Sequence, residues 1–159
     1  MCTFFMGDNM EYNSKYMDLA YNEAVKAFNN NEIPVGCVII KDDKIIASAY
    51  NLKEFNKCII DHAEMICIRN ASNILNNWRL SDCDIYITLD PCPMCASAIK
   101  QARIKNVYCG CSTNEFDNKI CNEIFNNIDR NNSVNFITDL DSDRCKKLLE
   151  DFFNKRRNN

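Results

Sequence analysis

Apolar residues recur at intervals of three and four in two long segments, and each segment predicts an amphipathic helix. The first segment spans residues 13–30, and we expect its apolar stripe to face a sheet. The second lies near the C-terminal end, where Asp141 is placed to cap the helix and basic residues close it. The stripes consist of Tyr16, Met17, Ala20, Ala24, Ala27 and Phe28 in the first helix, and of Cys145, Leu148, Leu149, Phe152 and Phe153 in the last.

Shorter apolar runs that are rich in β-branched residues predict strands. Residues 33–40 and 45–50 flank the polar turn Lys41-Asp42-Asp43-Lys44 and predict a hairpin. Residues 84–89 alternate, and the strand that they predict ends at Pro91. The other expected elements are a polar loop at 53–61, a helix at 62–76, a helix at 92–103, a strand at 104–111, an irregular loop with a short helix at 114–129 and a short strand at 134–137.

The order of these elements predicts an α/β fold of three layers, α/β/α, in which helices flank a mixed sheet of about five strands. The strand, helix and strand of residues 84–111 imply a parallel pair with a right-handed crossover. At 159 residues and 47% hydrophobic content, the chain can build one sizeable core but is short for two. We therefore expect one domain at residues 13–157, preceded by an N-terminal extension at residues 1–12.

Charge and cysteine content narrow the classes of function. The net charge of -3 argues against binding nucleic acid with the whole surface. The chain contains eleven cysteines, and its first eleven residues do not resemble a signal peptide. No apolar run reaches the roughly 18 residues that a membrane span requires. We expect free thiols in a reducing compartment, the cytoplasm and also the nucleus, and no membrane contact. Basic patches, which are more typical of solvated helix ends than of binding sites, consist of Lys100, Arg103, Lys105, Lys155, Arg156 and Arg157.

Two short motifs carry candidate metal ligands. His62 is the only histidine of the chain and stands where the loop meets the helix of 62–76. Cys92 and Cys95 are three positions apart at the start of a predicted helix, so both thiols share a face and can reach one metal ion. The helix N-terminus also stabilises the thiolate form that binds zinc. A redox pair, or two buried small residues, are the alternatives for the two cysteines.

One histidine and two cysteines leave the fourth position of a tetrahedral zinc ion open, as in catalytic zinc sites. Zinc lowers the pKa of a water in that position to about 7. Glu64, two residues after His62, is placed to move protons as a general acid and base. The pattern H-x-E followed by P-C-x-x-C is the signature of zinc deaminases that act on cytosine or adenine.

Beyond these residues, the sequence resembles the tRNA-specific adenosine deaminases of the cytidine and deoxycytidylate deaminase superfamily, in particular the eukaryotic catalytic subunit and its bacterial relatives. The matching motifs are Glu32-Ile33-Pro34-Val35-Gly36-Cys37-Val38, Asn51, Thr88-Leu89-Asp90-Pro91-Cys92-Pro93-Met94-Cys95 and Asp151-Phe152-Phe153-Asn154-Lys155-Arg156-Arg157. The resemblance implies a cytidine deaminase-like fold, one zinc ion per chain, and conversion of adenosine to inosine at the wobble position of tRNA. Water activated by zinc would attack C6 of a flipped adenine, and Glu64 would relay the proton.

The resemblance also implies the residues that bind the substrate. Asn51 would hydrogen-bond the base or ribose, and amides near Ala63 and Cys92 would contact the base. The remaining expected contacts come from the first-strand motif and the terminal helix, namely Val35, Phe152, Phe153 and Arg156. Two departures affect this transfer: Asp90 stands where the family usually has Glu, and residues 114–120 lack the family's glycine-rich loop, which shapes the substrate entrance.

The expected partners are the tRNA anticodon loop and a second deaminase subunit. Bacterial relatives form homodimers, whereas the eukaryotic catalytic subunit pairs with a related inactive chain. The acidic balance favours the heterodimer, since a partner can supply basic surface for tRNA. Two alternatives share the zinc motif: a deaminase of free bases, nucleosides or nucleotides of the cytosine, guanine or deoxycytidylate type, and an inactive zinc-stabilised partner subunit. Glu64 argues against the second.

Overall fold

The computed structural model describes residues 3–5, 11–112, 115–127 and 133–159. Its central sheet has five strands in the order β4-β3-β5-β6-β7. The bounds of the strands are β3 Gly36–Lys41, β4 Lys44–Tyr50, β5 Asp84–Leu89, β6 Asn106–Cys111 and β7 Asn135–Ile137. β3 pairs antiparallel with both β4 and β5, whereas β5 with β6 and β6 with β7 are parallel. The predicted mixed sheet, its hairpin and its parallel pair are confirmed.

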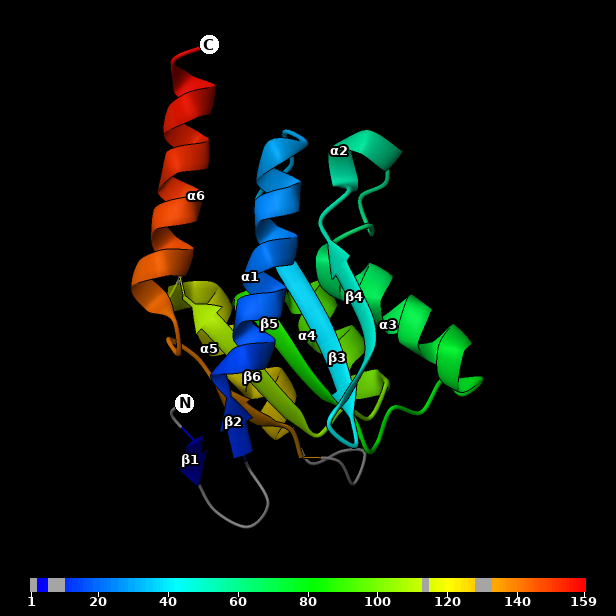
Figure 1. The fold of residues 1–159 in the computed structure, drawn as a ribbon. Helices are drawn as coiled ribbons and strands as arrows, with labels where there is room; N and C mark the ends of the chain where they lie inside the picture. The colour runs from blue at the N-terminus through cyan, green and yellow to red at the C-terminus, as the bar shows by residue number, and fades with distance from the viewer. Residues whose placement is uncertain (1–2, 6–10, 113–114, 128–132) are drawn as a thin grey trace.

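Helices cover both faces of this sheet (Figure 1). Their bounds are α1 Ser14–Asn29, α2 Lys53–Asn56, α3 Ala63–Leu75, α4 Pro93–Gln101, α5 Glu115–Asn126 and α6 Ser142–Arg157. Because side chains alternate along a strand, neighbouring residues of β3 enter different cores: Cys37 and Ile39 pack with α3, α4 and α5, while Val38 and Ile40 pack with α1. The predicted three-layer α/β/α fold is thus confirmed, and the stripe of the first helix faces the sheet as expected.

Several local elements differ from the prediction. The segment expected as a polar loop contains the one-turn helix α2. The short helix expected at 114–129 is the 12-residue α5. β3 starts only at Gly36, because the chain turns at Pro34 and the Val35 amide donates to the Ile33 carbonyl at 2.8 Å.

Two short strands precede α1 and were not expected. β1 (Thr3–Phe5) pairs antiparallel with β2 (Glu11–Asn13), which runs directly into α1. The Tyr12 ring stacks on Tyr86 with ring centroids 5.9 Å apart, so β2 covers part of the α1 side of the sheet. The division into an extension at 1–12 and a domain at 13–157 stays a prediction, and residues 1–2 and 6–10 lie outside the described residues.

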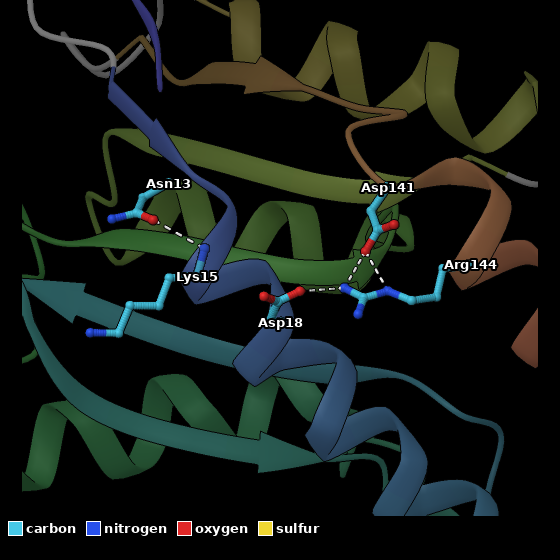
Figure 2. A network of polar contacts seen from close by, with 5 residues as sticks. All are labelled: Asn13, Lys15, Asp18, Asp141 and Arg144. Carbon is cyan, nitrogen blue, oxygen red and sulfur yellow. Dashed lines mark hydrogen bonds and ion pairs between the residues drawn. The ribbon is translucent and has the colours of Figure 1, made fainter. Parts of the chain in front are cut away.

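The C-terminal helix α6 is tied to α1 at its base (Figure 2). Asp141 occupies the predicted cap position, but its carboxylate accepts hydrogen bonds from the Arg144 guanidinium instead of capping the helix. Arg144 also donates to Asp18 of α1 at 2.8 Å and lies 4.1 Å from the centre of the Tyr21 ring. Such partly exposed ion pairs add little stability to the fold.

No helix in the described ranges has both the length and the apolar character that a bilayer span requires. The ten cysteines found in these ranges are all free thiols, as expected, and all of them except Cys58 and Cys92 are buried.

Candidate active site and metal centre

Three metal-ligand candidates come together where the N-termini of α3 and α4 meet. The Nδ1 atom of His62 lies 3.6 Å from the Cys92 sulfur and 3.5 Å from the Cys95 sulfur. The ligand atoms of all three residues lie within 4.8 Å of one another. His62 and Cys92 are the N-cap residues of α3 and α4, and neither side chain caps its own helix. Pro93 presets the first helical φ of α4, which places Cys95 in the first turn beside Cys92.

The electrostatics of this cluster fit a bound cation. The Cys95 thiol and the His62 ring stabilise the Cys92 thiolate and lower the pKa of Cys92 to about 4. The Cys92 sulfur and burial in turn raise the pKa of Cys95 far above that of an ordinary thiol. Without a cation only one of the two sulfurs can therefore carry the charge. A zinc ion, whose preferred ligands are thiolates and imidazole, removes this conflict, so the donor set fits zinc.

Glu64 lies in the first turn of α3, immediately after the His62 and Ala63 junction, and only 4% of it is exposed. Burial raises the pKa of Glu64 to about 7, and the nearby Cys92 acts in the same direction, while His62 opposes it. A carboxyl group with such a pKa can both accept and release a proton near neutral pH. Glu64 is therefore chemically suited to the proton transfers that the sequence suggested.

One pocket joins these groups to three of the expected substrate contacts. Val35, Asn51 and Ala63 line it together with Glu64 and two of the ligand candidates, His62 and Cys92. The pocket wall also contains residues that sequence reasoning did not propose as substrate contacts, namely Ile33, Lys53, Leu89, Asp90 and Asp117. Asp117 comes from α5, far from the other lining residues in sequence, and lies in the segment 114–120 that departs from the family's loop at the substrate entrance.

Asn51 is held in the pocket by its own side chain and backbone. Its Oδ1 accepts a hydrogen bond from the Lys53 amide at 3.1 Å, and its Nδ2 donates to the Ile33 carbonyl at 3.3 Å. The Asn51 amide donates to the Val35 carbonyl at 3.1 Å. Because an amide side chain can form four hydrogen bonds, Asn51 keeps one donor and one acceptor site beyond these contacts.

The first-strand motif also has a packing role. A Cβ atom on Gly36 would lie 2.0 Å from the Ala20 carbonyl oxygen, so only glycine allows α1 to pass this close to β3. The Gly36 amide donates to the Thr88 hydroxyl at 3.1 Å, which links the start of β3 to the end of β5. These contacts place Val35 at the pocket wall.

The three expected contacts of the C-terminal helix lie outside this pocket. Phe152 is buried and packs edge-on against Phe28 with ring centroids 6.0 Å apart, so its side chain joins α6 to α1. Phe153 and Arg156 are exposed, and the Arg156 guanidinium lies 5.2 Å from the centre of the Phe152 ring. Phe153 lines a second groove with Lys146 and Arg157, and this groove shares Ile33 and Leu89 with the pocket.

Lys100, a member of one basic patch suggested by the sequence, is not on the surface, whereas Lys105 of the same patch is exposed. Lys100 is only 5% exposed, and its amino group donates to the carbonyls of Ile124, at 2.8 Å, and Asn127. These carbonyls belong to the C-terminal end of α5, where a cation is favourable. Lys100 is thus a structural residue and not part of a nucleic-acid surface.

Comparison with known proteins is consistent with the site. Residues 10–111 match the family model described as the cytidine and deoxycytidylate deaminase zinc-binding region. The tRNA-specific adenosine deaminase of Streptococcus pyogenes serotype M18 (strain MGAS8232) is 35% identical over 150 residues, which are 94% of each chain. The chloroplastic tRNA(adenine(34)) deaminase of Arabidopsis thaliana is 52% identical over 95 residues, 60% of this chain and 7% of that protein.

A solved structure from studies of A-to-I editing by tRNA:A34 deaminases at the wobble position superposes with a TM-score of 0.79. It is 30% identical, and the match covers 86% of this chain and 100% of the other. The chain therefore belongs to the zinc-binding cytidine and deoxycytidylate deaminase family and is a zinc-dependent hydrolytic enzyme. Within this family it groups with the tRNA-specific adenosine deaminases, the name of the bacterial relatives that match it over nearly their whole length.

Proposed function

We propose that the protein converts adenosine to inosine at the wobble position of tRNA anticodons, with release of ammonia. The observation that carries this proposal is the buried Glu64 beside the His62, Cys92 and Cys95 cluster, with Glu64, His62 and Cys92 lining one pocket. Similarity to tRNA-specific adenosine deaminases over nearly the whole chain supports the choice of substrate.

His62, Cys92 and Cys95 hold the zinc ion in this proposal. When bound, zinc acts as a Lewis acid that makes water a nucleophile at neutral pH. The Glu64 carboxylate takes one proton from the attacking water and delivers it to N1 of the adenine ring. It then takes the second proton from the oxygen newly bound at C6 and delivers it to the amine, which leaves as ammonia. The pKa of about 7 keeps both forms of Glu64 accessible during this cycle.

The other pocket residues orient the nucleoside. Asn51 uses its remaining donor and acceptor to bind the base or the ribose, and the Ala63 amide contacts the base. Val35 supplies an apolar surface for the flipped base, and the polar groups of Asn51 and Ala63 orient that base. Flipping costs least in a single-stranded loop, so the anticodon loop is a favourable target.

The outer contacts come from α6. Phe153 and Arg156 are exposed, and the groove lined by Phe153 adjoins the pocket, since Ile33 and Leu89 line both. We assign the nucleotides next to the target base to this groove, where Lys146 and Arg157 can contact phosphates. Phe152 supports this surface from the core side.

A dimer is part of the proposal, with a related inactive deaminase subunit as the second chain. Exposed apolar side chains in and after α2 support a partner surface beside the pocket: Phe55 is 79% exposed, Ile59 70% and Ile60 44%. A partner with basic residues would offset the net charge of -3. We place the protein in the cytoplasm and also in the nucleus, where thiols stay reduced.

The direct test is to incubate the zinc-loaded protein with tRNA and, separately, with free adenosine, guanine, cytosine and deoxycytidylate, with and without a candidate partner subunit. We expect inosine at the wobble position of tRNA and no release of ammonia from the free compounds. Deamination of a free compound alone would replace the proposal with the small-molecule alternative. Absence of any deamination in zinc-loaded protein, with or without the partner, would favour an inactive subunit.

A further inference from the structure

The turn between β5 and α4 receives hydrogen bonds from two other elements. Asp90, two residues before Cys92, lines the pocket, and each of its carboxylate oxygens accepts a different donor. The Asn118 amide of α5 donates to Oδ2 at 2.7 Å, and the Thr138 hydroxyl, just after β7, donates to Oδ1. The Asp90 backbone amide donates to the Cys111 carbonyl at 2.9 Å. This turn is therefore the point where α5 and the end of β7 are joined to the zinc side.

The orientation of the Asn118 amide follows from its neighbours. Its Oδ1 accepts a hydrogen bond from the Asn122 amide at 3.0 Å, one turn further along α5. The Nδ2 group then faces Asp90, which as a carboxylate can only accept. Every polar atom of this contact has a partner of the right kind, which is what a specific polar link requires.

Two further contacts hold α5 in place along its length. Cys121, three residues after Asn118 and so on the same helix face, donates its thiol hydrogen to the Pro91 carbonyl at 2.9 Å. At the other end, the buried Lys100 of α4 binds the carbonyls of Ile124 and Asn127. α5 is thus attached at both ends to the turn and helix that carry Cys92 and Cys95.

The residue that α5 brings into the pocket is Asp117, adjacent to Asn118. We infer that Asn118 and Thr138 are positioning residues for the reaction: through Asp90 they fix the α5 wall and so set where the nucleoside lies relative to Glu64. This inference rests on the proposed function. The two departures from the family pattern, Asp90 and the segment 114–120, are joined by one hydrogen bond and act as a unit.

An exchange of the two side chains tests this link. Asn118→Asp places two carboxylates against each other and removes the donor, so we expect kcat on tRNA to fall roughly tenfold to hundredfold, as for other small displacements of a reacting group. The double variant Asp90→Asn/Asn118→Asp restores a donor facing an acceptor, keeps an acceptor for Thr138 and for Asn122, and keeps the net charge. We expect it to recover most of the lost rate.

Three controls accompany the exchange. Asn126→Ala changes an exposed asparagine of the same helix and should leave kcat unchanged. Zinc content should equal that of the wild type in every variant, because no ligand is altered. Hydrogen exchange of the α5 amides should speed up in Asn118→Asp and return toward wild type in the double variant. Thr138→Val, which removes the other donor, should lower kcat in the same direction and serves if Asn118→Asp does not fold.

The outcomes separate the inference from the proposed function. If the wild type makes no inosine in tRNA, the proposed function fails, and hydrogen exchange still shows whether the link holds α5. If the wild type is active and Asn118→Asp keeps its rate, or loses it without recovery in the double variant, the inference is wrong. Loss of zinc in step with activity, or faster exchange with unchanged kcat, would also overturn it, because Asn118 would then act on the metal or on stability alone.

Discussion

The zinc side of the pocket and the wall that α5 contributes are built in different ways. On the zinc side, two helix N-termini meet, and the ligands and Glu64 come from two short motifs. The wall comes from α5, whose Asp117 reaches the pocket because Asn118 and Cys121 bind the turn that precedes α4. Both sides use the same turn, but only the zinc side is recognisable as a motif.

The difference reflects what each side must do. Metal binding and proton transfer require particular atoms at particular distances, and few residue types provide them. The pocket wall requires only a surface at the right place. Many residue types can supply this surface if the helix that carries them is held in position. Substitutions on the zinc side should therefore abolish the reaction, whereas those on the wall and rim should change how well the substrate fits.

Removal of a metal ligand should have the largest effect. Cys95 is buried, and its sulfur lies 3.5 Å from His62 Nδ1, so Cys95→Ala leaves two ligand candidates. We expect the purified variant to contain almost no zinc by mass spectrometry of the metal and to form no inosine above background. Cys58→Ala, which changes a half-exposed thiol outside the cluster, should keep both. A zinc-loaded, active Cys95→Ala enzyme would remove Cys95 from the ligand set.

Glu64→Gln should come next. It keeps the shape of the side chain but cannot take up a proton, so kcat should fall by about 10²- to 10⁴-fold, the range typical for general acid and base catalysis. Zinc content, measured by metal analysis, and tRNA affinity, measured by filter binding, should stay near wild type. Single-turnover assays measure the loss of rate. If the variant keeps more than about a tenth of the wild-type rate, the loss is smaller than general acid and base catalysis predicts, and another group transfers the proton.

Asn51→Ala tests a residue that lies in the pocket but outside both the zinc motifs and α5. We expect kcat/KM to fall roughly tenfold to hundredfold, since one hydrogen bond to substrate and the support of the Lys53 amide are lost. Asn56→Ala is the matched control, because it removes a 2.7 Å hydrogen bond to Asp61 in the same loop without reaching the pocket. Equal losses in both variants would mean that Asn51 acts only by holding the loop.

Arg156→Ala should have the smallest effect. The side chain is exposed on α6, so its removal should raise KM for tRNA a few-fold, leave kcat unchanged and lower the slope of affinity against salt by about 1. Lys147→Ala, on the same helix and paired with Asp151 at 3.1 Å, should not change KM. Identical salt dependence in wild type and Arg156→Ala would place the tRNA elsewhere.

Much of the fold could be predicted from local patterns. The apolar stripe of α1, the hairpin of β3 and β4, and the order of β5, α4 and β6 each depend on residues close in sequence. The exceptions have tertiary causes. α2 is held partly by the buried Glu32, whose carboxylate accepts hydrogen bonds from the backbone amides of Glu54 and Phe55. Arg144, which donates to the Asp141 carboxylate, also donates to Asp18 of α1.

For the site, the chemistry could be predicted from local motifs: His62, Glu64, Cys92 and Cys95 lie in two motifs whose residue types and spacing suit zinc and proton transfer. The residues around them depend on the packing of distant elements. The tertiary structure brought Val35, Asn51 and Ala63 into the pocket, made Phe152 and Lys100 packing residues, and added Asp117 through the contact of Asn118 with Asp90. A metal site is specified by side-chain chemistry at short spacing, whereas a pocket wall depends on how distant helices pack, which no local pattern records.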